Sequence, residues 1–176
     1  MQTENGLVPE GDGWFVLNVR DAQWVHSERL GSAGFWEGEL AWPEVGTTLG
    51  VLHPGQSGGF YHAEGNQESF LVLAGEGIVI VEGQERPLRQ WDYFHSPAGT
   101  PHVFVATGDS PFVYFAAGSR NEGASTVYLV DETALRHGAG VEQEATSGKE
   151  AYVGVRWQPG PFREGSLPDF ERRAAP

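Results

Sequence analysis

Residues 55–75 read GQSGGFYHAEGNQESFLVLAG, and this stretch decides the fold. A glycine-rich turn leads to His62 and Glu64, and Glu68 then opens an apolar run. Side chains two positions apart leave a strand on the same face, so His62 and Glu64 are expected to project together, while Glu68 begins the next strand. Imidazole and carboxylate suit a divalent transition-metal ion, and neither group is normally buried unless it is paired or coordinated.

A second stretch, residues 91–106, reads WDYFHSPAGTPHVFVA. His102 follows the Pro-rich turn of this stretch and starts another apolar run. Adjacent strands of a β-barrel can bring such side chains to one point, so the sequence predicts a mononuclear metal site. Its expected ligands are His62, Glu64, Glu68 and His102. Alternation does not fix the direction of His95, which is expected either beside this site or on the surface.

Short β-branched and aromatic runs separated by turn residues recur along the whole chain. Strands are expected at Trp14–Val19, Thr47–His53, Glu68–Leu73, Gly77–Val81, Asp92–His95, His102–Ala106, Phe112–Ala116 and Thr126–Val130. A hairpin turn is expected at Gly83-Gln84, and Pro87 places the return strand at an edge or a bulge. One short helix, residues 132–136 capped by Asp131, is expected. The fold class is therefore all-β with little helix, and a jelly-roll barrel is the preferred architecture.

The two stretches together resemble the two signature motifs of the cupin superfamily. The first motif is matched by Gly55, His62, Glu64, Glu68 and Gly75, with Glu64 in place of the family's second histidine. The second is matched by Pro97, Gly99 and His102, with Trp91 and Ala106 where the family has Gly and Asn. The resemblance covers about residues 47–117. It implies a double-stranded β-helix, and its four metal-binding positions map to the residues already singled out.

A chain of 176 residues is expected to form one core and one cupin domain, residues 1–176. The motif core is about 47–117, with an N-terminal strand extension at 13–46 and a C-terminal extension at 118–176. Residues 1–12 and the tail from Pro159 onward are rich in Pro, Gly and charge, and are expected to be mobile or to lie over the surface.

The substitution of Glu64 leaves two arrangements open. If all four residues bind the ion, two carboxylates neutralise a divalent charge and make the ion a weaker Lewis acid. Alternatively, His62, Glu68 and His102 form a two-histidine, one-carboxylate triad with open positions, and Glu64 is the catalytic general base. The ion is Fe, Mn, Ni, Co or Zn, because this ligand set accepts most first-row ions.

Other side chains are less informative. Tyr61, Phe70, Val72, Phe104 and Tyr114 are expected to pack in the core, with a pocket lining as the alternative. Three further histidines lack partners at ligand spacing and are expected to be solvated. These are His26, His53 and His137.

The net charge is −13, from 11 Lys and Arg against 24 Asp and Glu, which argues against binding of nucleic acid. No cysteine is present, so disulfides and thiolate chemistry are excluded. The first residues lack a basic and apolar signal pattern, and Phe112–Ala117 is too short to span a bilayer, so a cytoplasmic location without membrane contact is expected.

Two functions remain open. The first is metal-dependent chemistry on a small polar metabolite, of the dioxygenase or the isomerase and epimerase type. The second is non-catalytic binding of a small molecule, with the metal absent or structural. A homodimer is expected by analogy with small jelly rolls, with Trp14–Leu17 as the candidate pairing strand.

Overall fold

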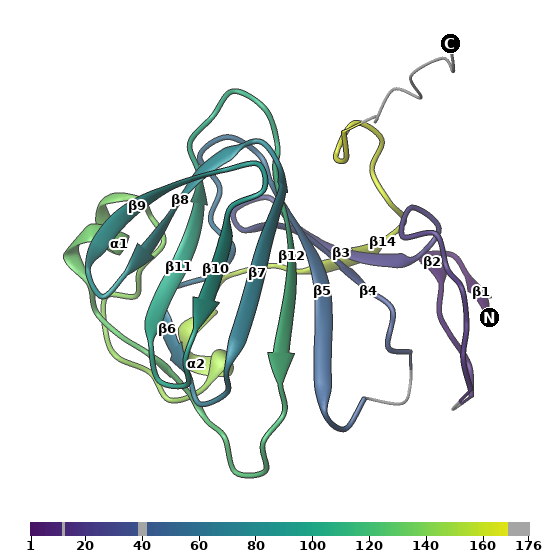
Figure 1. Cartoon of the computed structure of the whole chain (residues 1–176), viewed down its shortest axis with the longest axis horizontal. Coiled ribbons are helices and arrows are strands. Elements are labelled where there is room, and N and C mark those ends of the chain that lie inside the picture. The colour runs from purple at the N-terminus through teal and green to yellow at the C-terminus, as the bar shows by residue number, and fades with distance from the viewer. Residues whose placement is uncertain (12, 39–41, 169–176) are drawn as a thin grey trace.

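The computed structural model describes residues 1–11, 13–38 and 42–168. Two antiparallel sheets face each other across the core, and they remain two sheets rather than one closed barrel. Strands β7, β10 and β12 face β6, β8 and β11, whereas β5, β4, β3 and β14 extend to one side (Figure 1). This is the predicted all-β double-stranded β-helix, and the prediction of the fold class is confirmed.

The larger sheet has seven strands. Their order is β10 (Tyr93–Ser96), β7 (Glu68–Ala74), β12 (Phe112–Ser119), β5 (Val45–Leu52), β4 (Gly31–Phe35), β3 (Gln23–Ser27) and β14 (Gln158–Gly160). The smaller sheet has five, in the order β13 (Thr126–Tyr128), β6 (His62–Glu64), β11 (Pro101–Ala106), β8 (Glu76–Val81) and β9 (Gln84–Arg89). A separate short hairpin joins β1 (Gln2–Thr3) to β2 (Gly6–Leu7).

Alternation along the strands builds the core between the sheets. On β7, Phe70 and Val72 are buried in it, and on β11 the residues His102, Phe104 and Ala106 follow one another on the same inward face. The other face of β11 is also covered, because Val103 and Val105 pack with alanines of and after α1 (Glu132–Arg136). All five residues offered as core or pocket lining are buried in these two clusters. They are Tyr61, Phe70, Val72, Phe104 and Tyr114.

The β8–β9 hairpin turns at Glu82-Gly83, one residue earlier than predicted. Both residues have positive φ, 49° and 74°, as a two-residue turn matched to the strand twist requires. β9 is an edge strand, as Pro87 indicated. The helix α1 has the predicted residues, and the Asp131 side chain accepts a hydrogen bond from the Ala134 amide. A second short helix, α2 (Gly148–Ala151), was not predicted; Ser147 caps it in the same way.

The N-terminal expectation was partly wrong. Residues 14–19 form no strand, because no neighbouring strand pairs with them, and the side chains of Trp14 and Val16 are each 92% exposed. The prediction of a solvated His26 is also wrong, since its side chain is 4% exposed. At the other end, β14 pairs with β3, and Phe162 and Leu167 pack against the cluster around Trp24, so residues 158–168 lie over the larger sheet. The rest of the predicted mobile tail, residues 169–176, lies outside the described residues.

No helix formed by the described part of the chain has the length and apolar character needed to cross a bilayer.

Candidate metal centre

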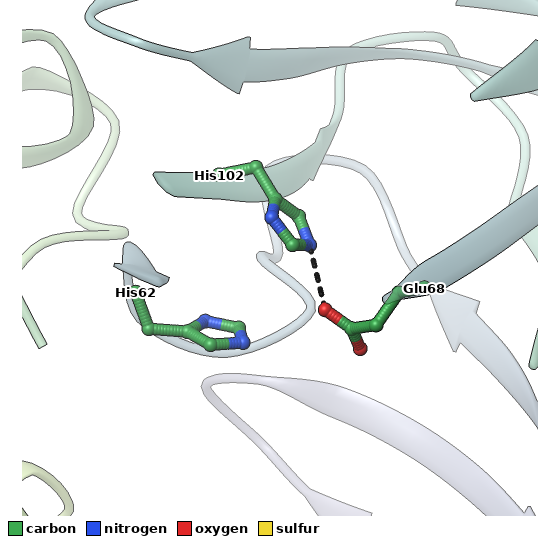
Figure 2. A group of neighbouring side chains, drawn as sticks. All are labelled: His62, Glu68 and His102. Atoms are coloured by element: carbon green, nitrogen blue, oxygen red, sulfur yellow. Dashed lines mark ion pairs between the residues drawn. The ribbon is translucent and has the colours of Figure 1, made fainter. Parts of the chain in front are cut away.

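Three of the four predicted ligands meet at one end of the space between the sheets. His102 on β11 is the direct cross-strand partner of His62 on β6, and Glu68 starts β7 in the facing sheet. One ligand atom from each residue lies within 4.8 Å of the others. The three side chains point toward one another from three strands (Figure 2). Neighbouring strands of the smaller sheet thus supply the two histidines, and the facing sheet supplies the carboxylate.

Backbone carbonyls fix the orientation of both imidazoles. His62 Nδ1 lies 2.8 Å from the carbonyl oxygen of Phe60, and His102 Nδ1 lies 3.0 Å from that of Thr100. A carbonyl can only accept, so each Nδ1 carries the proton and donates it, and each Nε2 presents its lone pair. Metal-ligating histidines are normally held in this way by a hydrogen bond through the other ring nitrogen.

Burial keeps both imidazoles neutral. Desolvation lowers the pKa of His62, against the raising effects of the Phe60 carbonyl and the Glu64 charge. Desolvation lowers the pKa of His102 to about 4, partly offset by the Thr100 carbonyl, and the neighbouring His62 lowers it further. Neutral imidazole is the form that binds a metal ion.

Burial also favours the neutral form of Glu68, but for a carboxyl this means a raised pKa. Burial, and then the negative charge of Glu64, raise its pKa from 4.5 to about 7. Its Oε2 lies 3.5 Å from His102 Nε2, the contact dashed in Figure 2. Because His102 is neutral near pH 7, this contact is not an ion pair. Buried Oε2 has no hydrogen-bond partner within the described chain.

When Glu68 is ionised, three lone-pair acceptors converge with no donor among them. Such a group is repulsive unless a proton or a cation lies between the atoms, and a buried acceptor without a partner costs about 1–3 kcal/mol. Two neutral imidazoles and one carboxylate match a first-row divalent ion and leave coordination positions open. The residues present therefore fit a metal ion of the predicted kind.

Glu64 lies near this group and is not part of it. Its Oε2 accepts a hydrogen bond of 2.6 Å from Thr126 Oγ1, and its Oε1 accepts one of 3.4 Å from Asn66 Nδ2. No local pattern predicts that β13 pairs with β6 and brings Thr126 opposite Glu64. The two histidines have their carbonyl and hydroxyl partners two to six residues away, and the strand pattern did not reveal those either.

Ser96 and Phe94, and not His95, are the residues of β10 that contact His102. The buried Oγ of Ser96 lies 3.3 Å from His102 Nδ1, and the side chain of His95 points outward and is exposed. His95 therefore takes the surface alternative.

A pocket of about 500 Å³ adjoins the group. Glu64 and Glu68 line one wall, so carboxylates connect the pocket with the three converging atoms. The rest of the lining includes Thr47, Thr48, Asn66 and Arg120. The guanidinium of Arg120 is held by Glu37, with Nη2 2.7 Å from Oε1, and by the Trp42 carbonyl. The volume of this pocket, and the charged and hydroxyl groups among its otherwise apolar lining, suit a small ligand with polar groups.

The fold and the site define a class of protein, an all-β jelly roll that gathers histidine and glutamate side chains inside its two sheets. Residues 48–118 match the family model of the cupin domain. This match covers about two fifths of the chain and takes in both signature motifs, so it assigns this segment to the cupin domain family.

Comparison with known proteins supports the fold. A sugar phosphate isomerase of the cupin superfamily from Silicibacter pomeroyi has a TM-score of 0.53 and 19% identity, with 80% of this chain and 94% of that chain covered. The polyketide cyclase RemF from Streptomyces resistomycificus has a TM-score of 0.55 and 14% identity, with 69% and 90% covered. At these identities the likeness concerns the fold alone.

Among curated proteins, an oxalate-binding protein from Thermotoga maritima is 31% identical over 65 residues. The match takes in 37% of this chain and 54% of that protein, so the chain spans about half the length of its curated relative.

Proposed function

We propose that this cupin binds one divalent transition-metal ion through His62, Glu68 and His102 and acts on a small polar metabolite in the adjoining pocket. The observation that carries the proposal is the convergence of three acceptor atoms within 4.8 Å, with the buried Oε2 of Glu68 left without a partner. A cation between these atoms removes the repulsion and satisfies Glu68. The candidates remain Fe, Mn, Ni, Co and Zn, because the ligand set suits all of them.

Of the two arrangements open to Glu64, we favour the general base. Thr126 and Asn66 engage both of its carboxylate oxygens, and it lines the pocket beside Glu68. Those hydrogen bonds hold the carboxylate at the pocket wall, where it can take a proton from a bound substrate. A three-residue ligand set leaves room for substrate on the ion, and a four-residue set leaves less.

This placement favours isomerisation or epimerisation over dioxygenation. A bound metal ion would supply Lewis-acid polarisation of a substrate carbonyl or hydroxyl. Glu64 then removes the proton from the adjacent carbon and returns it to another position, while Thr126 keeps the carboxylate oriented. The polar wall of the pocket, with Thr47 and Thr48, orients substrate hydroxyls.

A second candidate is binding of a small carboxylate without turnover. It is favoured by the similarity to the oxalate-binding protein. The same metal ligands serve this function, because a carboxylate can occupy the open coordination positions. Glu64 has no proton to move in that case.

Metal content tests the shared part of both candidates. Elemental analysis of the untreated protein is expected to find about one transition-metal ion per chain, and Co²⁺ titration followed by visible absorption is expected to saturate at the same ratio. His102→Ala is expected to abolish binding. His95→Ala is the matched control, since His95 is an exposed histidine on the neighbouring strand. Equal metal content in the two variants would remove the proposed site.

Exchange of substrate protons separates enzyme from binder. A panel of small hydroxy acids, keto acids and sugars is incubated with the metal-loaded protein in D₂O and followed by proton NMR. The enzyme proposal expects deuterium at a carbon next to a carbonyl, lost in Glu64→Gln although that variant keeps its metal. Saturable binding of oxalate with no exchange in any compound supports the binding candidate instead.

We also retain the single-domain and homodimer expectations as proposals. One domain is supported by the packing of Phe162 and Leu167 against the cluster around Trp24. A dimer is supported by the exposed apolar side chains of Trp14 and Val16, which would be covered in a pair. Light scattering after size-exclusion chromatography is expected to give twice the chain mass, and a monomer mass at micromolar concentration excludes the dimer.

A further inference from the structure

A second pocket, of about 290 Å³, lies on a different part of the molecule and shares no residue with the metal centre. It is formed where the turn after β3 meets the segment after α2 and the segment after β14. Three arginines, Arg29, Arg156 and Arg163, line it, one from each of these segments. They are three of the 11 basic residues in a chain of net charge −13.

These arginines are not neutralised by neighbouring acids. Neither Arg156 nor Arg163 makes an ion pair or side-chain hydrogen bond with any residue in the described ranges. Arg29 borders the pocket, but its guanidinium is turned toward a neighbouring one: it lies 4.8 Å over the ring of Phe60, and Nη2 donates to the Gly138 carbonyl at 3.3 Å. Glu28 is the one acidic residue among those lining the pocket.

The wall behind the arginines is rigid and carries no charge of its own. His26 lines the pocket, with Nδ1 2.8 Å from Ser32 Oγ and Nε2 2.9 Å from the Pro161 carbonyl. Burial lowers the pKa of His26, partly offset by the Pro161 carbonyl, and the Arg163 charge lowers it further, so the ring is neutral at neutral pH. Its hydrogen bond to Pro161 ties down the segment that carries Arg163.

We propose that this pocket binds the phosphate group of a small molecule. Arg156 and Arg163 supply the guanidinium groups that bind the anion, and the charges of all the lining residues, three arginines and Glu28, sum to +2, which matches a phosphate monoester of charge about −1.5 to −2 at pH 7. Guanidinium forks fit phosphate oxygens in pairs, and an anion between Arg156 and Arg163 relieves their mutual repulsion. The volume equals about ten water molecules at about 30 Å³ each, enough for the phosphate and a small substituent.

Calorimetric titration at low ionic strength tests the site with two probes, inorganic phosphate and glycerol phosphate. The wild-type chain is expected to bind at least one of them saturably in the millimolar range or tighter. The double variant Arg156→Gln/Arg163→Gln is expected to lose at least about tenfold in affinity. The control is Arg86→Gln/Arg89→Gln, which removes the same charge from exposed positions on β9.

Phosphate can also bind metal ions, so Glu68→Gln is titrated in parallel. Retained affinity in that variant assigns the ligand to the arginine pocket, and lost affinity assigns it to the metal centre and overturns the proposal. Equal affinity of the two double-arginine variants, or no saturable binding by the wild-type chain, overturns it as well. Tighter binding of glycerol phosphate identifies an ester as the ligand, whereas equal binding identifies the free ion, and both support the site.

Discussion

Glu68→Gln tests two effects of the carboxylate, which lowers the stability of the metal-free protein and serves as a ligand to the proposed metal ion. In the metal-free protein the buried Oε2 faces the lone pair of His102 Nε2 at 3.5 Å and has no hydrogen-bond partner within the described chain. The pKa of Glu68 is therefore raised, and the protonated carboxyl fits the fold better than the carboxylate does. Its contribution to the free energy of unfolding is favourable below the unfolded pKa of 4.5, and is lost as the pH rises through about 7.

The magnitude follows from that pKa. Raising it from 4.5 to about 7 costs about 3 kcal/mol once the carboxyl is ionised, at about 1.4 kcal/mol for each unit of pKa. Glutamine is neutral at every pH and has nearly the same shape. Metal-free Glu68→Gln is thus expected to exceed the wild type in stability by up to about 3 kcal/mol at about pH 8, and to differ little at about pH 4.

The assay is urea unfolding of both metal-free proteins across this pH range. The difference between them isolates Glu68, because every other titrating group is shared. Glu76→Gln, at an exposed position on β8, controls for the loss of one negative charge. With a saturating metal ion the order is expected to reverse, because the wild type gains the binding free energy and the variant has lost a ligand.

Two results contradict this reasoning. A metal-free Glu68→Gln variant that is less stable than the wild type at about pH 8 means that Glu68 has a favourable partner in the fold. A variant that keeps the metal affinity of the wild type means that Glu68 is not a ligand.

Three further predictions concern the site and the motif residues. The dissociation constant of the metal is expected to rise about tenfold for each pH unit below about 7, because Glu68 must lose its proton on binding; a metal titration with no pH dependence between about 7 and 5 contradicts this. Trp91, at the motif position of a glycine, has φ of 76°, a backbone conformation that strains any residue with a Cβ. Trp91→Gly is therefore expected to stabilise the fold by about 1 kcal/mol in thermal unfolding, whereas Trp91→Ala keeps the strain. Equal unfolding midpoints for the two variants would argue against backbone strain at this position. Gly75 has φ of 77°, and a Cβ there would overlap the Pro111 carbonyl oxygen. Gly75→Ala is therefore expected to lower the free energy of unfolding in urea by at least about 2 kcal/mol. An unchanged free energy of unfolding would refute the close approach.

The sequence by itself determined the elements whose signal is local. The predicted strands of the motif core begin within two residues of their predicted bounds, because alternation and turn glycines act over a few residues, although β12 continues three residues beyond its predicted end at Ala116. Asp131 predicted α1 for the same reason, since a cap bonds to an amide three residues away. The convergence of His62 and His102 was implied by the resemblance to the two cupin motifs and not by periodicity, because the two residues lie on different strands.

The remaining elements depend on partners that are distant in the chain. β3, β4 and β14 were not predicted, since short runs such as QWVHS, GSAGF and QPG become strands only when a neighbour supplies hydrogen bonds. The same reason explains the opposite error at residues 14–19, where an apolar run with strand propensity finds no strand to pair with.

The chemistry of the two pockets was decided by tertiary structure alone. Glu64 and Glu68 look alike in sequence. Glu64 accepts a hydrogen bond from Thr126 on a neighbouring strand, whereas Glu68 Oε2 is buried beside the two histidines and has no hydrogen-bond partner within the described chain. Three arginines from three separate segments meet at one surface pocket, a proximity that no spacing encodes. Local patterns determine which way a side chain leaves its own strand, and only the packing of distant segments determines what that side chain meets.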